Sequence, residues 1–254
     1  MFAKIQEYSG APATFCENAA TLLAKVFGKD NLCYTGLTGN KNLLAHTLTL
    51  NEGAKLEGVT LTNPETKKIA YAIPAGISFN VRSLDINDIL PYSGKHMALS
   101  NLLSLGYLWH NIREVGGAYG TGLRFARRGA MNVYSYRDPK VKETYDIYDN
   151  IANYLATNEF TDGEILGCII STLADFVNPK SMEQEGIENE IGYLAGYSYE
   201  EKAKHMADVL SFNRDDIKAF IPVFEAFKNS PAECSVGNGA NQTNYGKFDE
   251  IINL

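Results

Sequence analysis

The stretch from residue 110 to residue 139, HNIREVGGAYGTGLRFARRGAMNVYSYRDP, constrains the fold more than any other part of the chain. Its glycines lie at 116, 117, 120 and 122. Glycine tolerates positive φ and has no side chain, so this density favours a sharp bend or a backbone that lies close to another segment. The stretch follows an amphipathic helical pattern and contains two strand-like runs, LRF and MNVYSY. It therefore predicts a turn from a helix into a sheet, with or without a functional site built on it.

Composition excludes several functions. The chain has 254 residues, 45% hydrophobic and 21% charged, which is typical of a soluble globular protein. A net charge of −7 argues against nucleic-acid binding, because no basic block is present to neutralise phosphates. No apolar run reaches the ~18 residues needed to span a membrane. The four cysteines are widely spaced, without a C-x-x-C pair, which indicates free thiols and predicts a cytoplasmic protein.

The hydrophobic periodicity predicts an α+β fold with a mostly antiparallel sheet and helices on one face, forming a single domain over residues 1–254. The central helix, 95–113, should bury Ala98, Leu102, Leu105, Trp109 and Ile112. Asp138 should cap a helix that begins at Pro139. The other expected elements are helices at 13–28 and 41–50, strands at 32–37, 69–73, 77–81 and 233–237, helices capped by Thr161, Ser198 and Asn213, and a final helical turn at 247–254.

Familiar catalytic motifs are absent from the sequence. The four histidines, at 46, 96, 110 and 205, do not form the H-x-x-E-H of inverted zinc proteases, which needs two imidazoles on one helix face. There is no G-x-S-x-G nucleophile motif, and the clustered glycines do not form G-x-G-x-x-G. Arg137-Asp138 lacks the histidine of the kinase H-R-D motif. We expect no metal site in this chain, and any metal-dependent chemistry would need ligands from elsewhere.

Two motifs carry a resemblance to a known family. The sequence R-x-x-G-G-A-Y-G, from Arg113, followed by S-Y-R-D-P, resembles the C-terminal half of the M16 metallopeptidases of the insulinase/pitrilysin superfamily. The M16C branch, with presequence protease and falcilysin-like enzymes, is the most similar, and the densest match runs from residue 108 to about 148. This resemblance implies a two-layer M16 peptidase-like (LuxS/MPP-like) domain. It also implies that the chain is a piece of a longer peptidase.

The resemblance also implies a division of roles. In such enzymes the N-terminal half binds zinc and carries the general base, so this chain would hold no cofactor itself. Arg113 and Tyr119 would be catalytic residues that contact the substrate and the developing oxyanion, and Gly116 and Gly117 would be substrate-binding positions. The chemistry is suitable, because a guanidinium and a phenol both donate hydrogen bonds to a peptide carbonyl. The expected partners are the N-terminal half and a peptide substrate, with no nucleic acid and no membrane.

Three functions follow from these features. The first is the substrate-binding, active-site-completing C-terminal domain of a zinc-dependent metalloendopeptidase that degrades unfolded peptides, inactive in isolation. The alternative is a non-catalytic M16-like subunit that assembles with an active partner, although scaffolding alone would not need both Arg113 and Tyr119. The third is a ligand-binding module built on the glycine-rich turn. An H-x-x-E-H encoded upstream of this chain would favour the first.

Overall fold

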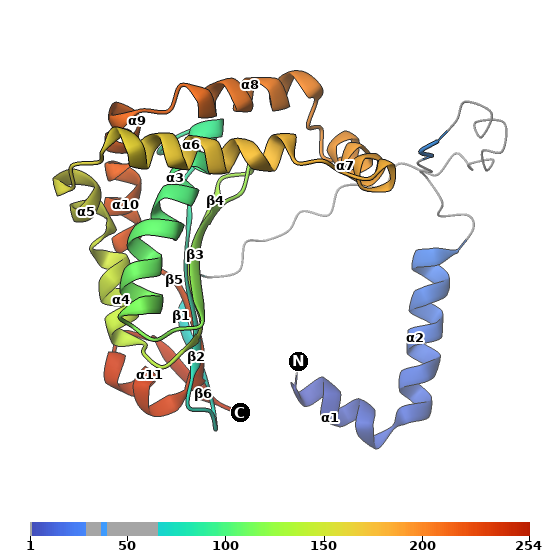
Figure 1. The fold of residues 1–254 in the computed structure, drawn as a ribbon. Helices are drawn as coiled ribbons and strands as arrows, with labels where there is room; N and C mark the ends of the chain where they lie inside the picture. The colour runs from blue at the N-terminus through green and yellow to red at the C-terminus, as the bar shows by residue number, and fades with distance from the viewer. Residues whose placement is uncertain (1, 29–36, 40–65) are drawn as a thin grey trace. The chain divides into compact units, whose positions relative to one another are not determined.

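The computed structural model describes residues 2–28, 37–39 and 66–254 (Figure 1). The predicted helix at 41–50 and nearly all of the predicted strand at 32–37 lie outside the described residues. The chain divides into two compact units, Met1–Thr62 with Lys180–Gly196, and Asn63–Pro179 with Tyr197–Leu254. A single domain over residues 1–254 stays a prediction.

The described part of the first unit is helical. It contains α1 (Phe2–Gly10), α2 (Pro12–Phe27) and α7 (Met182–Leu194). The helix predicted at 13–28 is therefore confirmed, and Pro12 occupies its first turn, where a missing N–H costs nothing. A reciprocal capping box between Ser181 and Gln184 starts α7.

The second unit consists of a six-stranded sheet and helices packed on one of its faces (Figure 1). The strand order is β3-β4-β2-β5-β1-β6, antiparallel from β3 to β5 and parallel between β5, β1 and β6. The predicted α+β class with a mostly antiparallel sheet is confirmed. The strands are β1 (Lys68–Ile73), β2 (Ser78–Asp85), β3 (Gly120–Phe125), β4 (Ala130–Asp138), β5 (Ala232–Asn238) and β6 (Glu250–Asn253).

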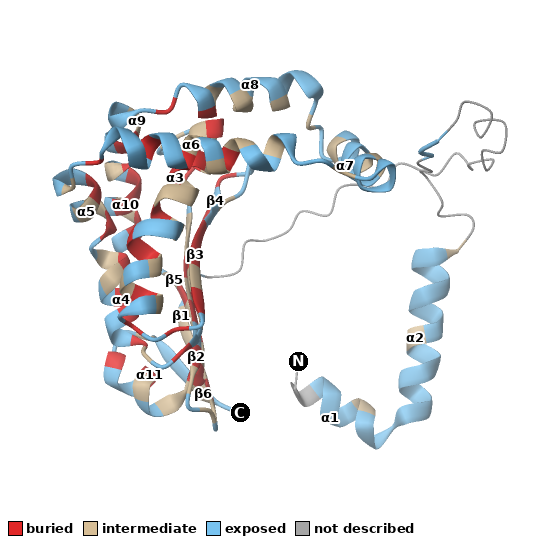
Figure 2. Ribbon diagram, viewed as in Figure 1, coloured by how far each residue is buried: buried red, intermediate tan, exposed pale blue. Residues whose placement is uncertain are grey.

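The helices of this unit bury one stripe each against the sheet or against one another (Figure 2). Their shared core contains fully buried Leu99, Leu108, Val133, Tyr145 and Phe227. The predicted caps at Thr161, Ser198 and Asn213 are confirmed as capping boxes. The helices are α3 (Gly94–Leu103), π-helix η3 (Ser104–Glu114), α4 (Lys142–Asp149), α5 (Ile151–Thr157), α6 (Asp162–Val177), α8 (Tyr199–Leu210), α9 (Arg214–Ala219), α10 (Ile221–Lys228) and α11 (Gly239–Tyr245).

The central helix is not a continuous α-helix, and the predicted buried face is wrong at Leu105 and Trp109, whereas Ala98 and Ile112 are buried as predicted. From Ser104 the backbone is a π-helix, in which the N–H of Val115 donates to the carbonyl of His110, five residues earlier. This wider turn changes which positions face the core. Leu105 is 63% exposed and Trp109 only half-buried. The apolar positions that do face the core are Ala98, Leu99, Leu103, Tyr107, Leu108 and Ile112.

Two further predictions are also wrong, the helix cap at Asp138 and the final helical turn at 247–254. Asp138 ends β4 instead of capping a helix, and α4 begins only at Lys142, because the Asp138 carboxylate is buried and bonded to side chains of other segments. The final segment is strand β6, which pairs in parallel with β1. Local periodicity could not show this pairing, because it depends on a partner far away in sequence.

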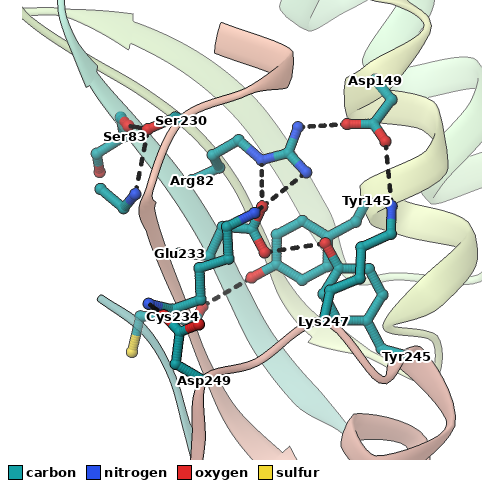
Figure 3. A network of polar contacts seen from close by, with 12 residues as sticks. Arg82, Ser83, Tyr145, Asp149, Ser230, Glu233, Cys234, Tyr245, Lys247 and Asp249 are labelled. Atoms are coloured by element: carbon teal, nitrogen blue, oxygen red, sulfur yellow. Dashed lines mark hydrogen bonds and ion pairs between the residues drawn. The ribbon is translucent and has the colours of Figure 1, made fainter. Parts of the chain in front are cut away.

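A buried ion network joins the sheet to α4 (Figure 3). The Arg82 guanidinium, 1% exposed, donates to Glu233 at 2.9 Å and to Asp149 at 2.5 Å. Glu233 also accepts from Lys68 at 3.0 Å and from the Tyr245 hydroxyl at 2.9 Å. Each buried charge therefore has an opposite charge and further hydrogen bonds, which offset its loss of hydration.

We expect His96 to make the stability of this unit dependent on pH. The ring is fully buried in α3, and burial lowers the pKa of His96 to about 4 from an ordinary 6.5. Between these values the unfolded chain binds a proton that the folded one excludes. The free energy of unfolding should therefore fall as the pH drops from 6.5 towards 4, by ~3 kcal/mol from this residue alone.

The variant His96→Gln tests this expectation, because Gln keeps an acceptor for the backbone N–H of Ser93, which now donates to Nδ1 of His96 at 3.1 Å. Urea unfolding of both proteins at several pH values measures the difference. The stability gap between wild type and variant should shift in favour of the variant as the pH falls. A gap that stays constant from pH 7 to 4 would show that His96 does not titrate in this way.

Candidate functional site

The glycine-rich turn connects the end of η3 to β3. The Gly117 N–H donates to the carbonyl of Arg113, and the Ala118 N–H donates to that of Ile112, both at 3.0 Å. Gly117 has φ +85°, a region that favours glycine. At Gly116 an added Cβ would lie 2.3 Å from the Ile112 carbonyl oxygen. The turn therefore needs glycine at both positions, and it reverses the chain directly after Arg113.

This reversal brings together Arg113 and Tyr119, the two predicted catalytic residues. The guanidinium carbon of Arg113 lies 4.0 Å from the centroid of the Trp109 ring and 5.6 Å from that of Tyr119. Trp109 thus supports the guanidinium through a cation–π contact. Arg113 is half-buried and Tyr119 is 58% exposed. Glu114 pairs with His110 at 2.9 Å, so this adjacent carboxylate is engaged by His110.

The other two glycines, 120 and 122, make room for tyrosines on the neighbouring strand. An added Cβ would lie 2.4 Å from the Tyr136 ring at Gly120 and 2.8 Å from the Tyr134 hydroxyl at Gly122. The Tyr136 ring lies 5.6 Å from that of Tyr119. We call Tyr119, Tyr134 and Tyr136 the aromatic surface. It extends along β3 and β4 beside the turn.

Sequence reasoning missed one residue at this place, Arg137. Its guanidinium carbon lies 5.5 Å from the Tyr119 ring centroid, and its side chain is exposed. The backbone has φ 49°, the left-handed region, at the only non-glycine residue with positive φ in the described part of the chain. The signal was present in the S-Y-R-D-P motif, where we had interpreted Asp138 as a helix cap.

Each histidine among the described residues has its own separate surroundings. His96 is buried, His110 pairs with Glu114, and Nδ1 of His205 lies 3.0 Å from the Tyr197 hydroxyl. His46 lies outside the described residues. In the part that the structure describes, no group of three or more His, Cys, Asp or Glu side chains could hold a metal ion. In the same part, no helix has the length and apolar character of a membrane span.

Comparison with known proteins shows the family to which the chain belongs. A family model described as PreP C-terminal domain matches residues 83–236. Protein HypA of Clostridium perfringens is 35% identical over 150 residues, 58% of this chain and 15% of that protein. The mitochondrial presequence protease of Gibberella zeae is 31% identical over 157 residues, 61% of this chain and 15% of that protein. The matched region thus covers only 15% of the length of each of these relatives.

Among solved structures, the peptidase M16 inactive domain from Pseudomonas fluorescens superposes with a TM-score of 0.55 at 16% identity, covering 74% of this chain and 47% of that one. The fold is therefore that of an M16 peptidase domain. With residues 83–236 matched, the chain belongs to the PreP C-terminal domain family. The resemblance to the M16C peptidases is confirmed.

Proposed function

We propose that this chain is the C-terminal, substrate-binding domain of a zinc-dependent metalloendopeptidase that degrades unfolded peptides. The observation that carries the proposal is the convergence of Arg113 and Tyr119 at an accessible turn between the π-helix and the sheet, where the Arg113 guanidinium carbon lies 5.6 Å from the Tyr119 ring centroid. The family membership supports a peptidase. The zinc, the general base and the remaining partner surface would come from the N-terminal half of the same enzyme.

The two side chains suit stabilisation of an oxyanion. When water adds to a peptide carbonyl, negative charge develops on the carbonyl oxygen, and donors held in place before the reaction stabilise it most. Arg113 is supported by Trp109, and the Tyr119 hydroxyl belongs to an exposed ring, so both are positioned to donate. Gly116 and Gly117 would hold this turn near the peptide.

A non-catalytic assembly subunit remains the alternative, and the encoded sequence upstream separates the two. An H-x-x-E-H in the same reading frame or in a separately encoded partner, together with peptide hydrolysis by the assembled protein, would support the peptidase. The cytoplasmic location of the chain is a separate matter, and it also stays a prediction. Assembly with an active partner whose hydrolysis does not depend on Arg113 would favour the subunit.

The 254-residue chain alone should bind no zinc stoichiometrically and hydrolyse no peptide. The reason is that the histidines of the sequence lack the ligand spacing of a zinc helix. Metal analysis after chelator treatment and dialysis against zinc measures the first, and a fluorogenic peptide assay measures the second. One tightly held zinc per chain would contradict the proposed division between the two halves.

A further inference from the structure

We propose that Arg137 is a further substrate-binding residue, which together with Arg113 forms a clamp around Tyr119 that takes a carboxylate of the bound peptide. The inference rests on the proposed function and names a chemical feature of the substrate. It begins from the two guanidinium carbons, which lie 5.6 and 5.5 Å from the centroid of one phenol ring.

The backbone at Arg137 is held in an uncommon conformation. A left-handed residue other than glycine is strained and persists only where its surroundings determine it. Here the following residue, Asp138, is buried, and its carboxylate accepts from the hydroxyls of Ser135 at 2.6 Å and Thr144 at 2.7 Å. The backbone N–H of Lys140 adds a bond of 2.9 Å.

A backbone bond then ties this end of β4 to the turn. The Tyr119 N–H donates to the Arg137 carbonyl at 3.3 Å. The buried Asp138 thus anchors a strained backbone whose exposed side chain lies beside Tyr119. Strained backbone conformations of this kind are common at ligand-binding positions, because they cost free energy that a position without a function could recover by relaxing.

The charges around Tyr119 are unbalanced. Elsewhere Arg82 and Arg214 form ion pairs with carboxylates, whereas neither Arg113 nor Arg137 has one among the described residues. Asp138 does not compensate Arg137, since its oxygens are bonded to neutral donors. Two guanidinium groups contact this one ring, and no carboxylate among the described residues pairs with either, so a bound anion would compensate their positive charge.

Carboxylate is the anion that peptides carry, and a guanidinium binds it through two parallel N–H···O bonds. A peptide can present it as its C-terminus or as an Asp or Glu side chain. Both sources have the same chemistry, so the experiment uses peptides that separate them.

The test measures binding of labelled, unstructured peptides to the 254-residue chain by fluorescence anisotropy at low salt. One peptide has no acidic residue and an amidated C-terminus. A second has the same sequence with a free C-terminus, and a third is amidated with one internal Gln replaced by Glu. We expect at least one of the two carboxylate peptides to bind about tenfold more tightly than the neutral one, with an advantage that salt weakens. Which of them does so identifies the source.

The advantage should disappear in Arg137→Gln and persist in Arg124→Gln. Arg124 is a matched control, because it is also exposed, lies on β3 and contacts a tyrosine of the aromatic surface, Tyr134, at 5.6 Å. Arg137→Gly provides a second variant that accepts the left-handed backbone. It should unfold at the same or higher denaturant concentration as wild type and still lose the advantage, so a loss of folding cannot explain the result.

The possible results distinguish this inference from the proposed function. Equal binding of neutral and carboxylate peptides by the wild type would overturn the clamp and leave the peptide-binding role intact. Equal loss in Arg124→Gln and Arg137→Gln would also overturn it, because the effect would then be one of general positive charge. Failure of the wild type to bind any of the peptides would overturn the proposed peptide-binding role as well.

Discussion

Replacing Arg113 by alanine, or Tyr119 by phenylalanine, is expected to lower the kcat of the complete peptidase by ~10²–10³-fold. Each change removes one hydrogen-bond donor from the developing oxyanion. Tyr119→Phe is the sharper variant, because it keeps the ring contacted by both guanidinium groups and removes only the hydroxyl. The measurement is steady-state hydrolysis of an unstructured peptide by this chain assembled with the half that carries zinc.

Tyr119→Phe should leave folding nearly unaffected, since substitutions at exposed positions usually change stability by less than ~0.5 kcal/mol. Arg113→Ala also removes the cation–π contact with Trp109, which should lower the free energy of unfolding by about 0.5–1 kcal/mol. Arg124→Ala is the control for kcat, as it removes an equal charge from an exposed position of β3. Full activity in Arg113→Ala and Tyr119→Phe, or a large loss of stability in either of them, would show that Arg113 and Tyr119 have a structural role instead. Unchanged kcat in Arg124→Ala would show that the effect is specific to the turn.

Breaking the buried ion network should cost more stability than any surface change. Glu233→Leu should lower the free energy of unfolding by ~3–5 kcal/mol, because it leaves the Arg82 guanidinium buried with only Asp149 as its anionic partner. Asp149→Asn, at the partly exposed end where the carboxylate side chain is 19% accessible, should cost much less. Chemical denaturation with circular dichroism measures both.

The double variant Arg82→Met/Glu233→Leu separates the net contribution of the ion pair to the free energy of unfolding from the cost of leaving one charge unpaired. We expect it to recover most of the stability lost in Glu233→Leu, since an apolar pair of similar volume avoids burying an ion. A double variant less stable than Glu233→Leu would show instead that Arg82 contributes through its contacts with the Tyr145 and Phe227 rings, each 5.3 Å from its guanidinium carbon.

Features encoded within a few residues could be predicted well. The capping boxes at Thr161 and Ser198 each need only a residue and its neighbour three positions later, and both formed as expected. The turn at Gly117 follows from glycine's tolerance of positive φ. The candidate pair Arg113 and Tyr119 was found from a motif of eight residues, and the structure brings the two side chains together.

The π-helix could not be predicted by the same means. A regular spacing of apolar residues placed Leu105 and Trp109 on the core face, and the structure exposes Leu105. The core must be filled by Leu103, Tyr107, Leu108 and Ile112, and the wider turn of a π-helix is what aligns them. Periodicity assumes an α-helical turn, so it cannot detect a departure from that turn that packing imposes.

The sequence by itself determined the α+β class, most of the strands and caps, and the position of the glycine-rich turn, because these depend on local patterns and on the backbone freedom of glycine. Only the tertiary structure decided that β6 pairs with β1, that Asp138 is buried, and that Arg137 lies beside Tyr119. These three features have the same physical reason, which is that each depends on residues far apart in the sequence. Asp138 is held partly by Asn80, from a strand more than fifty residues earlier, and a contact over that distance is formed only when the sheet itself is assembled.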